Sequence, residues 1–180
     1  MRATGRHGAV VAMVFGLALA GCQDTASTSA PETALAPASA PFVKREGVSL
    51  ADAAVALVSL GGAPDSASRD FRDALAREFS ARGIVSAPDK KARYLLRVYL
   101  SARPDDGGAS LDYVVDVYDA TRVRQARLGD SFAVKGAGDA WSLMSTEALG
   151  AVAAACADNV AAFLSNAPEA KPAQALSYAQ

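Results

Sequence analysis

The sequence predicts an α+β fold, a two-layer sandwich of order β-α-β-β-β-α in which a small sheet carries two helices on one face. Two segments, 94–101 and 111–118, alternate more and less apolar side chains as strands do. Two others, 66–82 and 140–164, repeat apolar residues at the helical period. The chain length suits one folded domain with tails at its ends.

The first strand is expected at 53–60, where a short aliphatic run ends in two glycines. In the helix that follows, Phe71, Leu75 and Phe79 lie at i, i+4 and i+8 and therefore share one face. Gly83 comes just after this helix, where a left-handed residue commonly ends the last turn.

The next two strands form a hairpin, because the Asp- and Gly-rich segment 104–108 between them is strong turn chemistry. The more apolar set of each strand must face the same layer, so the numbers of facing residues must add up to an odd value. A sum of 213 places Arg97 opposite Asp116 and Tyr99 opposite Val114. We take this register as a hypothesis.

A weaker strand is expected at 123–134, after a turn at 119–122. Gly129-Asp130 interrupts its alternation and suggests a bulge. The last helix, 140–164, is rich in alanine and places Cys156 on its apolar stripe. Its setting predicts that the Cys156 thiol is buried.

The N-terminal segment has the pattern of an export signal. Arg2 and Arg6 precede an apolar run of ~12 residues, too short to span a membrane. The run ends in Leu19-Ala20-Gly21-Cys22, which resembles the lipobox of bacterial lipoproteins. This resemblance implies that residues 1–21 are removed and that Cys22 carries a lipid. The alternative is an ordinary secretory signal with a chance cysteine.

The resemblance also bears on location and domain organisation. Gln23, where inner-membrane sorting would favour Asp, implies an outer-membrane anchor facing the periplasm. Residues 22–47 are rich in Ala, Ser, Thr and Pro and are expected to form a disordered tether behind the lipidated cysteine. The folded domain is then expected at 48–165, followed by a disordered tail at 166–180.

Charge and composition exclude several function classes. Removal of residues 1–21 takes two arginines from the 18 basic residues and leaves 16 against 19 acidic ones, a formal charge of −3. Such a balance argues against nucleic-acid binding. The removed segment also holds the single histidine, His7, so His-based catalysis and His metal sites are not expected. We expect no catalytic residue, no metal and no cofactor.

The weaker chemical motifs have ordinary structural explanations. Asp112 and Asp116 are a carboxylate pair expected on the wet face of the sheet. The segment 136–139 is rich in glycine but lacks the lysine of a phosphate-binding loop, so a turn and helix cap is expected there. Lys90-Lys91-x-Arg93 is the nearest approach to a basic cluster, and a solvated loop is the expected role.

The order of elements resembles the periplasmic α/β domains grouped around the TolB N-terminal domain, with related arrangements in LpoB-like and LptE-like lipoproteins. The resembling pieces include the strand ending Val58-Ser-Leu-Gly-Gly62, the hairpin strand Ala92-Arg-Tyr-Leu-Leu-Arg-Val-Tyr99 and the closing helix. The likeness covers roughly residues 50–165 and is a pattern of elements. It implies a domain that binds proteins, or sometimes lipopolysaccharide, and does no chemistry.

The candidate partner surface is the sheet face that the helices leave uncovered. It is expected to expose an apolar patch, with the alternative that another segment or protomer covers it. The six residues placed on it are Leu95, Arg97, Tyr99, Val114, Asp116 and Tyr118.

The sequence therefore favours a membrane-anchored periplasmic lipoprotein, held by the lipid on Cys22, that acts as a non-enzymatic adaptor or accessory subunit of a cell-envelope assembly or transport machine. Its expected partner is an envelope protein. The alternative is a carrier lipoprotein for a lipid or a glycan, which would need a cavity between the sheet and the helices.

Overall fold

The computed structural model describes residues 42–173. The segment expected as a signal peptide (1–21), Cys22 with its expected lipid, most of the expected tether and the chain from residue 174 lie outside the described residues. The elements in chain order are β1 (Val48–Ser49), β2 (Val55–Gly61), α1 (Asp65–Ala81), η1 (Asp89–Lys91), β3 (Tyr94–Asp105), β4 (Gly108–Asp119), β5 (Arg124–Lys135), η2 (Trp141–Leu143), α2 (Thr146–Ser165) and β6 (Lys171–Pro172).

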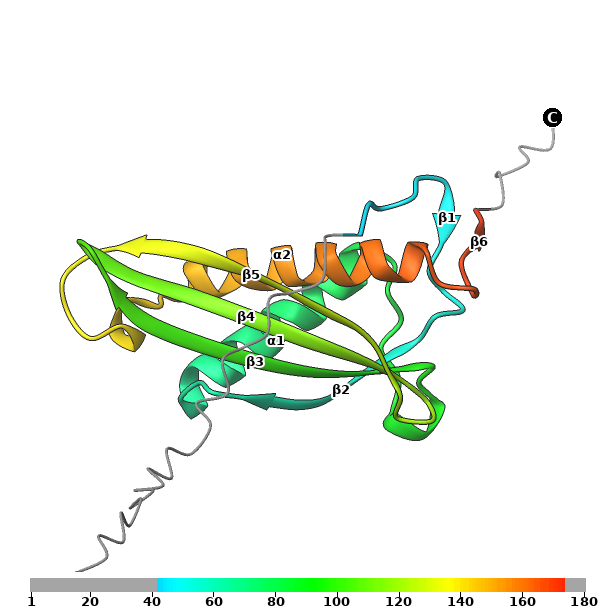
Figure 1. Cartoon of the computed structure of the whole chain (residues 1–180), viewed down its shortest axis with the longest axis horizontal. Helices are drawn as coiled ribbons and strands as arrows, with labels where there is room; N and C mark the ends of the chain where they lie inside the picture. The colour runs from blue at the N-terminus through cyan, green and yellow to red at the C-terminus, as the bar shows by residue number, and fades with distance from the viewer. Residues whose placement is uncertain (1–41, 174–180) are drawn as a thin grey trace, which may run out of the picture. The chain divides into compact units, whose positions relative to one another are not determined.

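The main sheet has the order β2-β3-β4-β5, with β2 parallel to β3 and the other pairs antiparallel. In Figure 1, α1 and α2 both lie behind this sheet, so the molecule has one layer of strands and one of helices. The predicted α+β class and the order β-α-β-β-β-α are confirmed. We call the strand face that the helices cover the inner face and the opposite one the outer face.

Helix α1 forms where the apolar period predicts it and buries Phe71, Leu75 and Phe79 against the sheet. Pro64 occupies the N-cap position, where its fixed φ suits the chain before the first turn. Gly83, at φ 69°, follows the end of the helix in the left-handed conformation that the sequence predicts.

The β3–β4 hairpin has the predicted register. Arg97 faces Asp116 and Tyr99 faces Val114, so the sum of 213 is confirmed over the whole ladder. The turn itself needs only two residues, Asp106 and Gly107, since β3 continues to Asp105 and β4 begins at Gly108. Gly107 adopts a φ of 75°, a conformation that costs glycine little.

The irregularity in β5 is not where the sequence suggests it. Gly129 and Asp130 pair regularly with Val114 and Tyr113, so the expectation of a bulge there is wrong. The register shifts instead next to Gln125, between the pairs of Val117 and Tyr118. Glycine lacks a side chain but keeps its backbone groups, and these suffice to continue a ladder.

Helix α2 begins six residues later than predicted, at Thr146. Ser145 is its N-cap, and the Ser145 hydroxyl oxygen accepts a hydrogen bond from the Ala148 amide at 3.1 Å. The preceding residues form the short η2 helix. The helix is long and apolar enough to cross a membrane, but it is largely buried inside the domain as its core helix. Cys156 is fully buried on it, as predicted.

The two ends of the described chain are joined to each other, a feature the sequence does not predict. Strand β1 pairs with β6, and the Gly47 carbonyl accepts a hydrogen bond from the Ala173 amide at 2.7 Å. We call residues 42–49 together with 166–173 the clasp. Within the clasp, residues 42–47 belong to the stretch expected as tether and 166–173 to the stretch expected as tail, whereas β1 falls in the expected domain.

The clasp is held to the end of α2 and the start of β3 by aromatic and polar contacts. The Phe163 ring meets Phe42 and Tyr94 edge to face, at centroid distances of 5.4 and 5.3 Å. The Glu169 carboxylate accepts hydrogen bonds from the Tyr94 hydroxyl at 2.7 Å and from Arg93 at 2.5 Å. Burial of the Tyr94 hydroxyl and its bond to Glu169 raise the pKa of Tyr94 to about 12.

Candidate interaction surface

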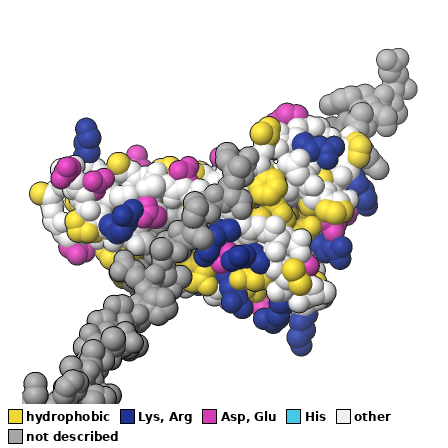
Figure 2. Space-filling view, in the orientation of Figure 1, with side chains coloured by type: hydrophobic (Ala, Val, Ile, Leu, Met, Phe, Trp, Pro, Cys, Tyr) yellow, Lys and Arg dark blue, Asp and Glu magenta, His cyan; other side chains and the backbone are white. Residues whose placement is uncertain are grey.

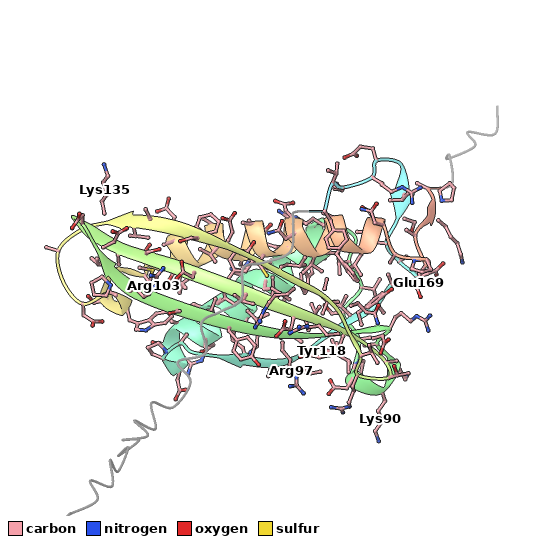
Figure 3. All side chains as sticks on the ribbon, in the orientation of Figure 1. Lys90, Arg97, Arg103, Tyr118, Lys135 and Glu169 are labelled. Atoms are coloured by element: carbon pink, nitrogen blue, oxygen red, sulfur yellow. The ribbon has the colours of Figure 1, made fainter. Side chains whose placement is uncertain are left out.

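The outer face is built by alternate residues of β3, β4 and β5. Because side chains alternate along each strand, the register that sends Leu96 and Val115 to the core sends Arg97 and Asp116 outward. Strand β5 then adds Arg127, which pairs with Asp116 across the β4–β5 ladder. In Figure 3, Arg97 and Tyr118 lie close together, towards the end of the sheet where β3 begins and β4 ends.

The six residues predicted for this surface are all on the outer face, but they are not equally accessible. Leu95, Val114 and Asp116 are buried, at 6, 8 and 4% exposure. Tyr99 is exposed at 39%, while Arg97 and Tyr118 are half-buried. Leu95 packs in a small cluster that includes Ala56, Ala92 and Tyr118. The surface is therefore made of tyrosine and arginine more than of the aliphatic residues expected.

Asp116 is the buried centre of this face, against the expectation of a wet carboxylate. Arg127 Nε lies 3.2 Å and Arg124 Nη1 3.6 Å from Asp116 Oδ1. The contact between Arg127 Nε and Asp116 Oδ1 is an ion pair without hydrogen-bond alignment, since neither of these two atoms has a hydrogen-bond partner. The hydrogen bond between the two residues is made by Arg127 Nη2, which donates to Asp116 Oδ2 at 3.4 Å. A single carboxylate thus serves two guanidinium groups, which leaves the site with excess positive charge.

Arg97 is held differently. Its guanidinium carbon lies 5.2 Å from the centre of the Tyr118 ring, a cation–π geometry. Among residues 42–173, no carboxylate lies within ion-pair distance of Arg97. We call Arg97, Tyr99, Tyr118, Arg124 and Arg127 the arginine–tyrosine cluster. Figure 2 shows basic and hydrophobic side chains side by side on this face.

Arg124 and Arg127 belong to this site, although the sequence pattern does not predict them there. They lie on a strand whose alternation is weak, and only the β4–β5 register brings them beside Asp116. In a regular strand, residues three apart point to opposite faces. The bulge at Gln125 adds one residue, so Arg124 and Arg127 point to the same face.

Asp112, the other carboxylate of the predicted pair, has its own partners. Arg103 Nη2 lies 2.7 Å from Asp112 Oδ2, and the Ser131 hydroxyl donates to Asp112 Oδ1 at 2.6 Å. Burial raises the pKa of Asp112, but the bonds from Ser131 and Arg103 outweigh it and bring the pKa below its usual value. Asp112 and Asp116 are thus each tied to arginines and do not form a joint site.

The remaining motifs of the sequence do not form a binding or catalytic site with the outer face. The Asp139 carboxylate accepts hydrogen bonds from the Trp141 and Ser142 amides, so the glycine-rich 136–139 segment is a turn and cap as predicted. Within residues 42–173, no group of three metal-ligating side chains comes together. Lys90 and Lys91 are exposed on η1. Burial of Cys156 raises the pKa of its thiol to about 12.

Comparison with known proteins gives similar structures but no matching family. No protein-family model matches the chain, and no curated protein matches its sequence. A PelC dodecamer structure from Paraburkholderia phytofirmans is 12% identical with a TM-score of 0.47, over 76% of this chain and 97% of that one.

Two further similar structures are described as lipoproteins. A minor lipoprotein from Acinetobacter baumannii is 14% identical with a TM-score of 0.44, over 62% of this chain and 94% of that one. Lipoprotein GNA1162 from Neisseria meningitidis is 11% identical with a TM-score of 0.39, over 61% and 96%.

Proposed function

We propose that the protein is a lipid-anchored periplasmic lipoprotein of the outer membrane that acts as a non-enzymatic adaptor in a cell-envelope machine, with the arginine–tyrosine cluster as its contact surface for an envelope protein. The anchor rests on Cys22 and the lipobox-like residues before it. The binding role rests on the outer face.

The observation that carries the proposal is the chemistry of this cluster. Tyrosine and arginine are the side chains that, with tryptophan, dominate the energetics of protein interfaces. Tyr99 offers an exposed ring, and Arg97 is positioned over Tyr118 without a carboxylate of its own in the described chain. A partner that supplies a carboxylate and an apolar surface would complement both.

The packing between the two layers favours an adaptor over a carrier. The side chains that meet there, among them Phe71, Leu96 and Leu149, are at most 1% exposed. A lipid or glycan carrier would need a cavity of several hundred Å³ in this place. The hydrocarbon side chains of this layer instead pack against one another, which supports a rigid scaffold that presents a surface.

The chemistry of the protein's side chains also favours binding over catalysis. The lone histidine, His7, lies in the signal segment. The Cys156 thiol is fully buried, where it is protonated and out of reach of a substrate. Asp112 and Asp116 on the outer face are each paired with arginine.

In-cell photo-crosslinking tests the proposal. Tyr99 is replaced by p-benzoylphenylalanine in the tagged, lipidated protein, and the crosslinked products are identified by mass spectrometry. A matched control places the same photo-reactive residue at Ser80, which is exposed on α1. We expect one dominant envelope protein from position 99, absent from position 80 and from a Cys22→Ser form.

The outcomes separate the two functions. Loss of that product in an Arg97→Glu background would tie the partner to the arginine–tyrosine cluster. Equal products from positions 99 and 80 would contradict the proposed surface. Retention of a lipid or glycan with no protein product would favour the carrier.

A further inference from the structure

Strand β2 is at the edge of the main sheet and has only β3 as a neighbouring strand within that sheet. Its other edge forms part of a second site. Strand β2 pairs with β3 on one side. On the other side, the Val55 amide donates to the Val85 carbonyl and the Ala87 amide donates to the Val55 carbonyl, both at 2.8 Å. The segment 85–87 therefore occupies the first position of this edge as a short parallel bridge.

The edge continues beyond that bridge. Pro88 follows Ala87, lacks an amide hydrogen and turns the chain into η1. Since both backbone groups of Val55 face away from β3, those of Leu57, two residues on, face the same way. Among residues 42–173, no backbone partner meets the outward groups of Leu57. A strand edge in this state accepts a further strand.

A small cavity lies directly beside Leu57, between β2 and α1. Its volume is about 140 Å³, close to what one aliphatic side chain occupies. Leu75, Ala76 and Phe79 line it from the helix, and Val55 and Leu57 line it from the strand. Leu57 is itself only half-buried. The site thus offers main-chain hydrogen bonds and an apolar pocket at the same position along the strand.

Arg72 supplies the charge of this site. It is exposed on α1 and borders the cavity, and no carboxylate of the described chain lies within ion-pair distance of it. A ligand whose side chains follow strand alternation would place residues i and i+2 on the helix side. A ligand with an aliphatic residue in the cavity and an acidic residue two positions away would therefore make an apolar contact and an ion pair with Arg72.

We propose that the groove between the β2 edge and α1 binds an extended peptide segment of a partner protein, which adds as a strand at Leu57, inserts an aliphatic side chain into the cavity and directs a carboxylate to Arg72. This is strand addition combined with a side-chain pocket. The groove lies at the β2 edge on the helix side, so its occupation does not depend on the arginine–tyrosine cluster.

Nuclear magnetic resonance titration tests the groove with defined probes. The processed chain carrying Cys22→Ser is titrated with the peptide Thr-Glu-Thr-Leu-Thr-Glu-Thr, blocked at both ends, up to millimolar concentration. We expect shifts of the Leu57, Ala76 and Phe79 resonances and slowed hydrogen exchange at the Leu57 amide. Replacing the central leucine of the peptide by glycine should weaken binding about tenfold or more.

Two controls make the test specific. N-methylation of the peptide main chain, which removes strand pairing without changing side chains, should abolish binding. In the protein, Ala76→Trp fills the cavity and should abolish binding, whereas Ala81→Trp, also exposed on α1 but away from the cavity, should not.

Three outcomes would overturn the proposal. One is the absence of any response at 55–61 to the peptide. Another is binding that survives both N-methylation and Ala76→Trp. The third is a Leu57 amide already protected in the free protein, because a second copy or another part of the chain would then occupy the edge.

Discussion

Arg97 on β3 and Asp116 on β4 stand directly opposite each other, yet they are not an ion pair. Asp116 is held by Arg124 and Arg127 of β5, and Arg97 turns to the Tyr118 ring instead. Cross-strand neighbours of opposite charge usually stabilise a sheet by pairing. Here the competition of three arginines for one carboxylate leaves a guanidinium available at the surface.

Arg97→Glu should abolish partner crosslinking from position 99 while leaving the fold intact. The substitution removes the free guanidinium and a cation–π contact of about 0.5–1 kcal/mol, so the melting temperature should fall by only a few degrees. Arg77→Glu, an exposed arginine on α1, is the charge-matched control and should crosslink normally. A large melting-temperature loss for Arg97→Glu alone would indicate a structural role.

Gly62→Ala and Gly150→Ala should change stability in opposite directions. At Gly62, φ is +87° and an added Cβ would lie 2.0 Å from the Leu100 carbonyl oxygen, so we expect a loss of about 2 kcal/mol or more. At Gly150, inside α2, an added Cβ meets nothing within 4 Å, so alanine should gain about 0.5–1 kcal/mol. Urea unfolding of both variants measures the free energy of unfolding. Equal changes in the two variants would contradict the predicted difference between Gly62 and Gly150.

Acid should weaken the clasp through Glu169. Burial raises the pKa of Glu169, but the bonds from Tyr94 and Arg93 prevail and hold it below its ordinary value of 4.5. Because the pKa is lower in the folded than in the unfolded chain, this stabilisation is complete above 4.5 and is lost as pH falls through the folded value. It amounts to less than about 1 kcal/mol at this partly exposed position.

Glu169→Gln measures that contribution. Its melting temperature should lie below that of the natural protein at neutral pH, and the difference should shrink as the pH falls below 4.5. A difference that stays constant from neutral to acid pH would show that the Glu169 charge does not act through titration.

Cys156 should react with a thiol reagent only when the protein unfolds. Its thiol is fully buried with a pKa of about 12, so at pH 8 the thiolate fraction is about one in ten thousand, and access is blocked as well. In a Cys22→Ser background, Ellman's reagent should show no fast phase until denaturant is added. Ser80→Cys, on the exposed side of α1, is the positive control, and equal rates at both positions would contradict the burial.

The sequence was most informative where side-chain periodicity and turn chemistry agreed. The register of β3 and β4 followed from the parity of apolar residues such as Leu96 and Val115, together with the short turn between them. The start of α2 could not be placed as well, since Trp141, Leu143 and Met144 extend the apolar pattern ahead of Ser145. The Ser145 cap sets the boundary instead.

The candidate site was only partly predictable. Arg97, Tyr99 and Tyr118 follow from alternation along β3 and β4, but Arg124 and Arg127 depend on a bulge that the sequence places elsewhere. The β1–β6 pairing was beyond prediction for another reason. Each strand is two residues long, and residues 171–172 gain their partner only because α2 returns the chain to Gly47.

The clasp determines how mechanical tension would enter the domain. A pull on the chain ahead of Phe42 first loads the bonds to the end of α2, where the Arg45 amide donates to Ser165 Oγ at 2.9 Å and Asn166 donates to the Val43 carbonyl at 2.8 Å. These contacts and the two-residue β1–β6 ladder must part before force reaches β2. A domain built this way can release several residues at its N-terminal end under load while its four-stranded sheet keeps its shape.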